Sequence, residues 1–179
     1  MAWERALVSG ASSGIGLSIV RELGRRRVPV VLVARDGDRL NKIAAEHPVE
    51  AEVLVADLSD GAELRIVEER IEAGDIDLLV NNAGFGLNGS FIAHDRDAEA
   101  DMVKVNVLAL HRLSHAAAGT MQEARRGTIL NVASVAAYTS MARSSTYSAT
   151  KAFVVSFSNA LASEPVSYTH LTLPTIYSV

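Results

Sequence analysis

The chain contains no cysteine among its 179 residues, which excludes disulfides, thiol catalysis and zinc–thiolate sites. No apolar run approaches the roughly 18 residues that span a bilayer, and no signal peptide opens the sequence, so no membrane partner is expected. A basic stripe is also missing and the net charge is only −4, which argues against nucleic acid as the main partner. These absences together indicate a soluble cytoplasmic protein.

The remaining composition fits one α/β domain, because 49% of the residues are hydrophobic and can fill a sizeable core. Strand and helix patterns alternate along residues 1–164 without internal repeats or a linker, which predicts a doubly wound parallel sheet. Strands are expected at 5–9, 28–34, 50–55, 77–81 and 128–132. Helices are expected at 15–26, 39–46, 60–73, 97–120 and from Tyr147 to 164, with Asp60 and Glu63 as a capping pair and Asp97 as a cap.

The first strand runs directly into a glycine-rich turn, Gly10-Ala-Ser-Ser-Gly14-Ile-Gly16, and then into an apolar-periodic helix. Glycines allow tight backbone geometry and the close approach of a pyrophosphate, while free N–H groups and the helix dipole supply positive potential. A strand, a glycine turn and a helix start in this order predict a dinucleotide phosphate site.

The same stretch also matches G-x-S-x-G, the nucleophile elbow of serine hydrolases, with Ser12 as the nucleophile. In that fold the elbow follows a central strand, with several strands already laid down before it. Only nine residues precede Gly10, enough for one strand and no oxyanion loop. The hydrolase is therefore the weaker interpretation.

Tyr147 and Lys151 lie four residues apart on the last predicted helix, so their side chains share one face. A phenol ionises near pH ~10, and a fixed positive charge beside it favours the phenolate. Ser134, on a preceding loop, can hydrogen-bond an oxygen on which charge develops. The three residues predict proton transfer to or from a hydroxyl or carbonyl oxygen.

With these motifs together, residues 4–164 resemble the short-chain dehydrogenase/reductase family. The motifs occur in the family's order and near its spacing: the glycine turn, Asp57-Leu58, Asn81-Asn-Ala-Gly84, Asn106, Ser134 and Tyr147 with Lys151. The resemblance implies a Rossmann-type sheet, a nicotinamide cofactor and reversible interconversion of an alcohol and a carbonyl compound.

The resemblance also implies roles for individual residues. Tyr147 is the acid/base, Lys151 lowers its pKa and holds the nicotinamide ribose, and Ser134 orients the substrate oxygen. Asn106 holds a water in a proton relay, or is simply a buried asparagine satisfied by its neighbours. The expected cofactor-binding residues are Gly10, Ser12, Ser13, Gly14, Ile15, Gly16, Arg35, Asp57 (adenine), Leu58, Asn82 (ribose), Ala83, Gly84, Tyr147 and Lys151.

The end of the second strand indicates the choice of cofactor. A ribose 2′-hydroxyl is usually met there by a carboxylate and a 2′-phosphate by arginine. Ala34 stands where the NAD-preferring members place their acid, and Arg35 comes next. Asp36 beside it and the uncharged Ser13 leave only one of the two usual positive contacts. The pattern favours NADP over NAD.

The sequence leaves an alternative function and the substrate open, and it argues against a metal site. A non-catalytic NADP-binding module is the alternative function, although such a module is expected to lose the tyrosine or the lysine first. His111 and His115 lie four apart on a helix, but no third ligand is near, so no metal is expected. A homo-oligomer is expected only by analogy with the family. The 135–138 segment suggests a partly apolar pocket wall, which does not distinguish a sugar, a steroid, an acyl chain or a small ketone.

Residues 165–179 depart from the family pattern and contain none of the chain's 17 basic and 21 acidic residues. No glycine follows Gly127, so the Pro-Gly that normally meets the nicotinamide is missing. The segment resembles read-through of a sequencing adapter and is expected to be a non-native tail. The sheet is then incomplete at its C-terminal edge, with the strand at 128–132 unpaired, and the chain itself is expected to be inactive.

Overall fold

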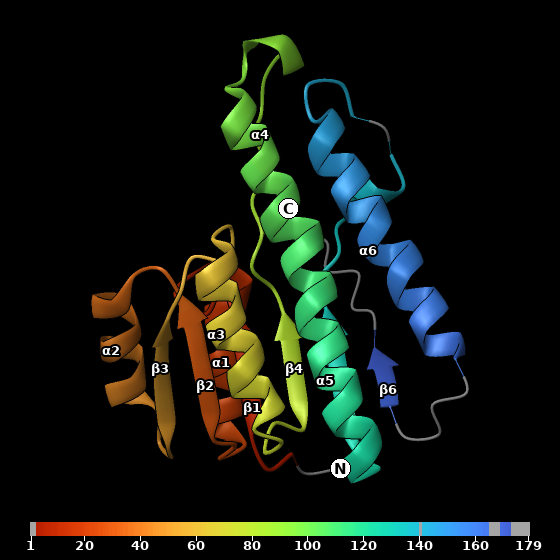
Figure 1. Ribbon diagram of the computed structural model, residues 1–179. Helices are drawn as coiled ribbons and strands as arrows, with labels where there is room; N and C mark the ends of the chain where they lie inside the picture. The colour runs from red at the N-terminus through yellow and green to blue at the C-terminus, as the bar shows by residue number, and fades with distance from the viewer. Residues whose placement is uncertain (1–2, 140, 165–168, 173–179) are drawn as a thin grey trace.

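The computed structural model describes residues 3–139, 141–164 and 169–172. Within these residues, parallel strands form one sheet in the order β3-β2-β1-β4-β5-β6 (Figure 1). The strands are β1 (Ala6–Ser9), β2 (Val30–Ala34), β3 (Ala51–Val55), β4 (Leu78–Asn81), β5 (Gly127–Asn131) and β6 (Thr169–Thr172). The order reverses between β1 and β4, which confirms the doubly wound Rossmann-type sheet.

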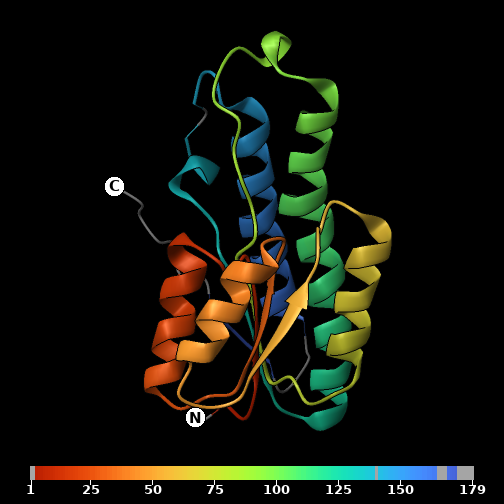
Figure 2. The same ribbon diagram turned by 90° about the vertical axis from the view of Figure 1, so that its left-hand side faces the viewer.

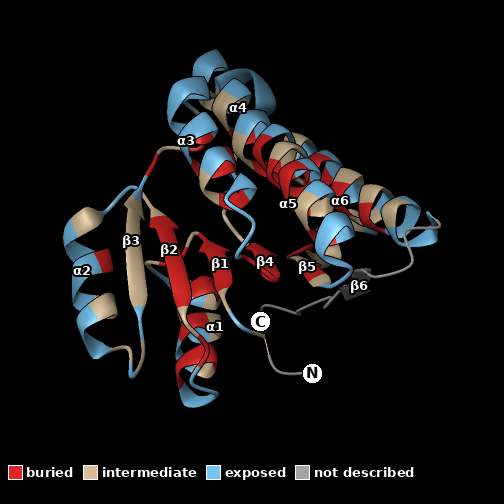
Figure 3. Cartoon of the chain, turned by 60° about the horizontal axis from the view of Figure 1, so that its bottom comes forward, coloured by how far each residue is buried: buried red, intermediate tan, exposed pale blue. Residues whose placement is uncertain are grey.

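Helices cover both faces of the sheet. Helices α1 and α2 lie on one face, and α3, α5 and α6 on the other (Figures 2 and 3). The helices are α1 (Gly14–Arg25), α2 (Gly37–Glu46), α3 (Gly61–Glu72), α4 (Arg96–Val103), α5 (Leu110–Ala124) and α6 (Ser145–Ser163), with 3-10 turns η1 (Phe91–Ala93) and η3 (Val135–Ala137) and a π-helical segment η2 (Lys104–Ala109).

Alternate side chains of β1 feed two separate hydrophobic cores. Leu7 points to the face covered by α5, where it joins the cluster of Leu113 and Met121. Val8 points to the other face and joins the cluster of Val20 from α1. Because both faces are covered, every residue of β1 is buried, as the apolar run in the sequence predicts.

The helix expected at 97–120 begins earlier and is not continuous. The side chain of Asp95, not Asp97, caps it by accepting hydrogen bonds from Asp97 N at 2.9 Å and Ala98 N at 3.1 Å. The prediction of the cap was wrong because two aspartates stand two residues apart, and the first one reaches the free N–H groups. The π-helical η2 then separates α4 from α5, a wider turn that no sequence pattern signalled.

The capping pair expected at Asp60 and Glu63 forms only in part. Asp60 caps α3, with its carboxylate 2.8 Å from Ala62 N and 3.0 Å from Glu63 N. The carboxylate of Glu63 instead accepts from Asp57 N at 2.6 Å. This bond fixes the turn that follows β3, where Asp57 faces the site described below.

Strand β5 is not the sheet edge that the sequence led us to expect. Thr128 pairs with His170 and Ile129 with Leu171, so β6 runs parallel to β5. The expectation of an unpaired β5 was wrong, because the free N–H and C=O groups of that strand pair with an extended segment rich in threonine. Apart from β6, the tail predicted at 165–179 lies outside the described residues.

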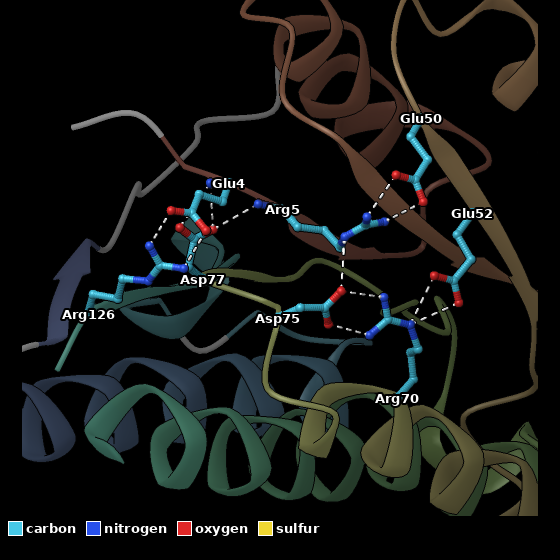
Figure 4. A network of polar contacts seen from close by, with 8 residues as sticks. All are labelled: Glu4, Arg5, Glu50, Glu52, Arg70, Asp75, Asp77 and Arg126. Carbon is cyan, nitrogen blue, oxygen red and sulfur yellow. Dashed lines mark hydrogen bonds and ion pairs between the residues drawn. The ribbon is translucent and has the colours of Figure 1, made fainter. Parts of the chain in front are cut away.

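Ion pairs join the strands at their amino ends (Figure 4). Asp75 pairs with Arg5 at 3.1 Å and with Arg70 at 2.6 Å, which links β1 to the end of α3. The carboxylate of Asp77 accepts from the backbone N–H groups of Glu4 and Arg5. The other members of the cluster are Glu50, Glu52 and Arg126. These contacts lie at the end of the sheet opposite the candidate site.

Candidate active site

A cavity of about 960 Å³ opens at the carboxyl ends of the strands. Parallel strands end at the same edge of a sheet, and the reversal of strand order between β1 and β4 leaves a crevice there. Fourteen of the residues predicted from the sequence line this cavity: Gly10, Ser12, Ser13, Gly14, Ile15, Arg35, Asp57, Leu58, Asn82, Ala83, Gly84, Ser134, Tyr147 and Lys151. Gly16 and Asn106 do not line it.

The glycines of the first turn have distinct functions. Gly10 has a φ of +65° and Gly14 a φ of +54°, a region that side chains with a Cβ rarely adopt. A Cβ on Gly16 would lie 2.2 Å from the carbonyl oxygen of Gly10, so this glycine lets α1 start against the turn. Nothing lies within 4 Å of the Cβ position of Gly14, which leaves open space beside the helix start.

The N-terminus of α1 is suited to an anion. Its N-cap, Ser13, makes no side-chain cap hydrogen bond, whereas α2, α3 and α4 are capped by Asp36, Asp60 and Asp95. The first N–H groups of α1 are therefore left without a side-chain cap, and the first turn of this helix has no acidic residue to repel a phosphate. The open space at Gly14 and these N–H groups fit the pyrophosphate of a dinucleotide.

Ser9 ties the glycine turn to the turn after β4. Its hydroxyl accepts hydrogen bonds from Asn82 N and Ala83 N, both at 3.0 Å, and donates to Val80 O. Asn82 Nδ2 donates to Ser9 O and Gly10 O at 3.0 and 3.1 Å. Both hydrogens of that amide are used, so the contact with a ribose that was predicted for Asn82 would fall to its Oδ1.

At the far end of the cavity, Arg35 lies near Asp57. Their charged groups are 3.7 Å apart, and the Arg35 side chain is 77% exposed. The backbone N–H and hydroxyl of Ser59 hydrogen-bond to Asp57 Oδ1 at 2.9 and 2.7 Å. The Ser59 backbone bond, with a smaller contribution from Arg35, holds the pKa of Asp57 below its usual value. A carboxylate and an exposed guanidinium thus stand side by side where the sequence predicts adenine and a 2′-phosphate.

Lys151 is buried beside Tyr147. Its ammonium donates to Val132 O at 2.8 Å and lies 5.9 Å from the centre of the Tyr147 ring. Only 6% of Lys151 is exposed, and burial lowers its pKa to about 8. A Cβ on Gly84 would lie 3.6 Å from the ammonium, so the backbone of the β4 turn also borders this charge. The cavity therefore contains a positive charge with little solvent around it, close to a phenol.

Asn106, on η2, holds the loop after β4 against α6. Its Oδ1 accepts from Phe85 N at 3.0 Å, and its Nδ2 donates to Phe85 O and to Thr150 Oγ1 at 2.9 and 3.0 Å. Thr150 in turn donates to Tyr147 O at 2.7 Å. The side chain is thus a buried asparagine satisfied by its neighbours, and the proton relay stays a prediction.

Ser134 caps η3, and its hydroxyl accepts from Ala136 N at 3.2 Å. It borders the same cavity as Tyr147, as their order in the sequence led us to expect. The hydroxyl hydrogen is not used in that contact, so it can be donated to an oxygen in the cavity.

Sequence reasoning missed three residues of this region: Ser9, Gly86 and Thr150. Gly86 lies against the Tyr147 ring, since a Cβ there would be 3.0 Å from Cδ2. Ser9 stands directly before the first glycine, and Thr150 stands three residues after the tyrosine. Their proximity to known motifs was a signal, but their partners lie up to 74 residues away in sequence.

Ser12 follows the first strand of the chain, and the residues from 3 to 12 contain no other strand. Among the described residues that line the cavity with Ser12 there is no histidine to act as its general base, which argues against the serine hydrolase. In the described part of the chain, no group of three or more His, Asp or Glu side chains is placed to hold a metal ion. No helix among those residues is long and apolar enough to cross a membrane.

A glycine turn before an uncapped helix and a buried lysine beside a tyrosine are the features expected of a dinucleotide-binding oxidoreductase. Comparison with known proteins agrees, since the model of the short chain dehydrogenase family matches residues 4–173. The chain belongs to the short-chain dehydrogenase family.

Two relatives and one solved structure illustrate the range of this similarity. Nodulation protein G of Rhizobium sp. (strain N33) is 36% identical over 163 residues, which cover 89% of this chain and 66% of that protein. The "inactive hydroxysteroid dehydrogenase-like protein 1" of Homo sapiens is 31% identical over 169 residues, or 90% of this chain and 51% of that protein. The chain thus spans between half and two thirds of these relatives.

The solved structure is that of a short-chain dehydrogenase from Sphingobium yanoikuyae in complex with NADPH. It matches with a TM-score of 0.88 at 36% identity, covering 94% of this chain and 70% of that one. The fold of this chain is therefore shared with a dehydrogenase whose structure contains NADPH.

Proposed function

We propose that the protein interconverts an alcohol and a carbonyl group on a small molecule, with NADP(H) as the redox partner. The observation that carries this proposal is the buried ammonium of Lys151 beside Tyr147, in the same cavity as the uncapped N-terminus of α1. A phosphate site and an acid/base site in one crevice serve hydride transfer coupled to proton transfer.

The bound cofactor supplies or accepts the hydride at the substrate carbon. Tyr147 donates its phenolic proton to the carbonyl oxygen during reduction and takes it back during oxidation. With a pKa of about 8, Lys151 is mostly charged at neutral pH, and its charge favours the phenolate that this transfer leaves. Ser134 donates a hydrogen bond to the same substrate oxygen. Burial strengthens each of these interactions, because little water screens them.

NADP is favoured over NAD because Arg35 stands exposed at the adenine end of the cavity. A guanidinium suits a phosphate, with which it forms charge-assisted hydrogen bonds. The relative from Sphingobium yanoikuyae, which is described in complex with NADPH, supports the same choice. NAD remains the second candidate, since Asp36 and Asp57 add negative charge nearby.

Replacement of the phenol tests the proposal. In a chain that carries the family's own C-terminal region in place of residues 165–179, Tyr147→Phe should lower turnover of a panel of ketones and aldehydes by at least ~10²-fold, because the proton donor is removed. NADPH affinity, followed by cofactor fluorescence, should stay nearly unchanged and thereby show that the variant is folded. Turnover above a tenth of the parent value in the variant would contradict the role of Tyr147.

A non-catalytic module that only binds NADP is the second candidate. It is suggested by the human relative, whose name describes it as inactive. In this chain, however, Tyr147, Lys151 and Ser134 all border the cavity. Tight NADPH binding with no turnover of any carbonyl in the panel would favour the module over the enzyme.

A further inference from the structure

A histidine and a glutamate form a partly buried pair outside the cavity. His94 directly follows η1, and Glu99 lies in the first turns of α4. His94 Nδ1 is 2.6 Å from Glu99 Oε1, and the two side chains are only 16% and 14% exposed. Because this charge-assisted hydrogen bond is short and largely shielded from solvent, it is expected to be stronger than an ion pair on the surface.

The His94–Glu99 pair lies where α4 packs against α6, the helix that carries Tyr147. The pKa of the Glu99 carboxyl lies below its usual value, mainly because of the Thr146 hydroxyl and to a smaller extent because of His94. Thr146 lies in the first turn of α6, directly before Tyr147. Helices α4 and α6 run side by side at this end of the molecule (Figures 1 and 2). Glu99 and Thr146 line the same small pocket as Tyr147, so the pair lies beside the start of the helix that carries the acid/base.

The pair reaches the loop after β4 through the imidazole. Gly89 lies against the ring, since a Cβ there would be 2.8 Å from His94 Nε2. Its φ of +152° is strained for residues with a side chain, so glycine permits this approach. Gly89 N donates to Arg143 O at 3.0 Å, which ties the loop to the segment leading into α6.

The same loop touches the acid/base directly. Gly86 borders the cavity and packs on the Tyr147 ring, 3.0 Å from Cδ2 as measured from its Cβ position. Asn106 holds Phe85 at the other end of the loop. The loop is thus fixed at Phe85 by Asn106 and at Gly89 by His94, with the contact to Tyr147 between these two points.

We propose that His94 and Glu99 are positioning residues for the reaction. Acting through the packing of α4 against α6 and through the Gly89 loop, they hold the Tyr147 ring in place from two sides without touching the substrate. This inference rests on the proposed function in one respect only, which is the use of Tyr147 as acid/base. The clamp itself is a structural property that can be measured without turnover.

The clamp is tested by hydrogen–deuterium exchange of the full chain. His94→Ala should raise exchange at least ~10-fold in peptides covering residues 85–93 and 143–150, because the Gly89–Arg143 hydrogen bond opens more often. His115→Ala removes an exposed histidine from α5 and should leave both segments unchanged. Unaltered exchange in both segments of His94→Ala overturns the proposal, whether or not the chain turns over a carbonyl.

The positioning role is tested by kinetics on the carbonyl of the panel that is turned over fastest. His94→Ala and Glu99→Gln should lower kcat by roughly 10–100-fold, since displacements near 1 Å cost about that much. The NADPH dissociation constant should change less than about twofold. His94→Asn places an amide N–H near the position of Nδ1 and should recover most of the lost kcat.

Two results separate the possible failures. A lower melting temperature with unchanged kcat in His94→Ala would mean that the pair only stabilises the fold, and the proposal fails. Full turnover in Tyr147→Phe would remove the proposed acid/base, while the exchange experiment would still decide whether the clamp exists.

Discussion

Lys151 concentrates the electrostatics of the site in one side chain. Its ammonium donates a hydrogen bond to the carbonyl oxygen of Val132, and the side chain is almost completely removed from water. Burial penalises the charged form, and for this reason its pKa falls to about 8. Lys151 is thus mostly charged at neutral pH, although its pKa of about 8 lies only about one pH unit higher.

This burial makes the stability of the protein depend on pH. The folded pKa of Lys151 is about 8, below the unfolded value of about 10.4. Between these values the unfolded chain keeps a proton that the folded chain has lost, so the free energy of unfolding should rise with pH. The gain is about 3 kcal/mol if the full shift is realised.

Urea unfolding of the parent and of Lys151→Met at pH 7.5 and pH 10 measures this effect. The variant lacks the ionisable group, so its stability should change less favourably than that of the parent over the same interval. An identical pH dependence of the two proteins would show that the lysine is not desolvated.

Arg35 provides the second prediction at this scale. Arg35→Ala should weaken NADPH by roughly 10-fold or more and NADH far less, because only NADPH offers a 2′-phosphate to the guanidinium. Arg39→Ala, which removes an exposed arginine of α2 near the same strand end, is the matched control. Fluorescence titrations with both cofactors give the ratio. Equal weakening of the two cofactors by Arg35→Ala would remove the 2′-phosphate role.

At the scale of elements, the start of α1 decides whether a phosphate can bind. The helix begins so close to β1 that Gly16 nearly touches the carbonyl of Gly10. Its N-cap leaves the first N–H groups uncapped, unlike the three aspartate-capped helices. The turn and the helix therefore act as one unit, and a change in their spacing should affect cofactor binding before it affects the rest of the sheet.

Gly16→Ala tests this unit. A Cβ at 2.2 Å from Gly10 O forces the turn to shift, so NADPH affinity should fall at least ~10-fold and stability by about 1–3 kcal/mol. Gly61→Ala, at the start of α3, is the matched control because nothing lies within 4 Å of its Cβ position. Calorimetric melting and NADPH titration of both variants make the comparison, and equal behaviour of the two would refute the steric explanation.

At the scale of the whole molecule, the candidate site and the ion-pair cluster lie at opposite ends of the sheet. The carboxyl ends of the strands form the cavity, and the amino ends are joined by the ion pairs of Figure 4. Asp75 is central because it binds Arg5 and Arg70 from different elements. The pKa of Asp75 lies below its usual value, mainly because Arg70 donates hydrogen bonds to its carboxylate.

Asp75→Asn should lower the free energy of unfolding by up to about 1 kcal/mol at neutral pH, since Asp75 is half exposed and water screens the pairs. The loss should shrink as pH falls through the folded pKa, where the parent carboxylate is also neutralised, and as salt is added. Glu22→Gln, which breaks pairs within α1 alone, should cost less. Urea unfolding at two pH values checks the order, and NADPH affinity should not change.

Local chemistry made much of this protein readable from its sequence. Glycines at Gly10, Gly14 and Gly16 after an apolar strand predict a tight turn into a helix, and the structure has that turn, while its binding of a phosphate stays a prediction. Tyr147 and Lys151 share a face because four residues are about one helical turn. The alternation of strand and helix patterns predicts the parallel sheet, since each unit must bury an apolar face against its neighbours.

Other features depend on contacts between distant segments, and only the tertiary structure decided them. The sequence left Asn106 as either a relay residue or a buried asparagine, and only the structure shows its partners, Phe85 and Thr150, 21 and 44 residues away. The contact of Lys151 with Val132 and the pairing of β5 with β6 also join segments that lie apart in the sequence. The sequence places His94 and Glu99 five residues apart, but only the packing of α4 against α6 brings this pair close to Tyr147. Sequence spacing determines which side chains share an element, whereas packing determines which elements meet, and with them the environment of each charge.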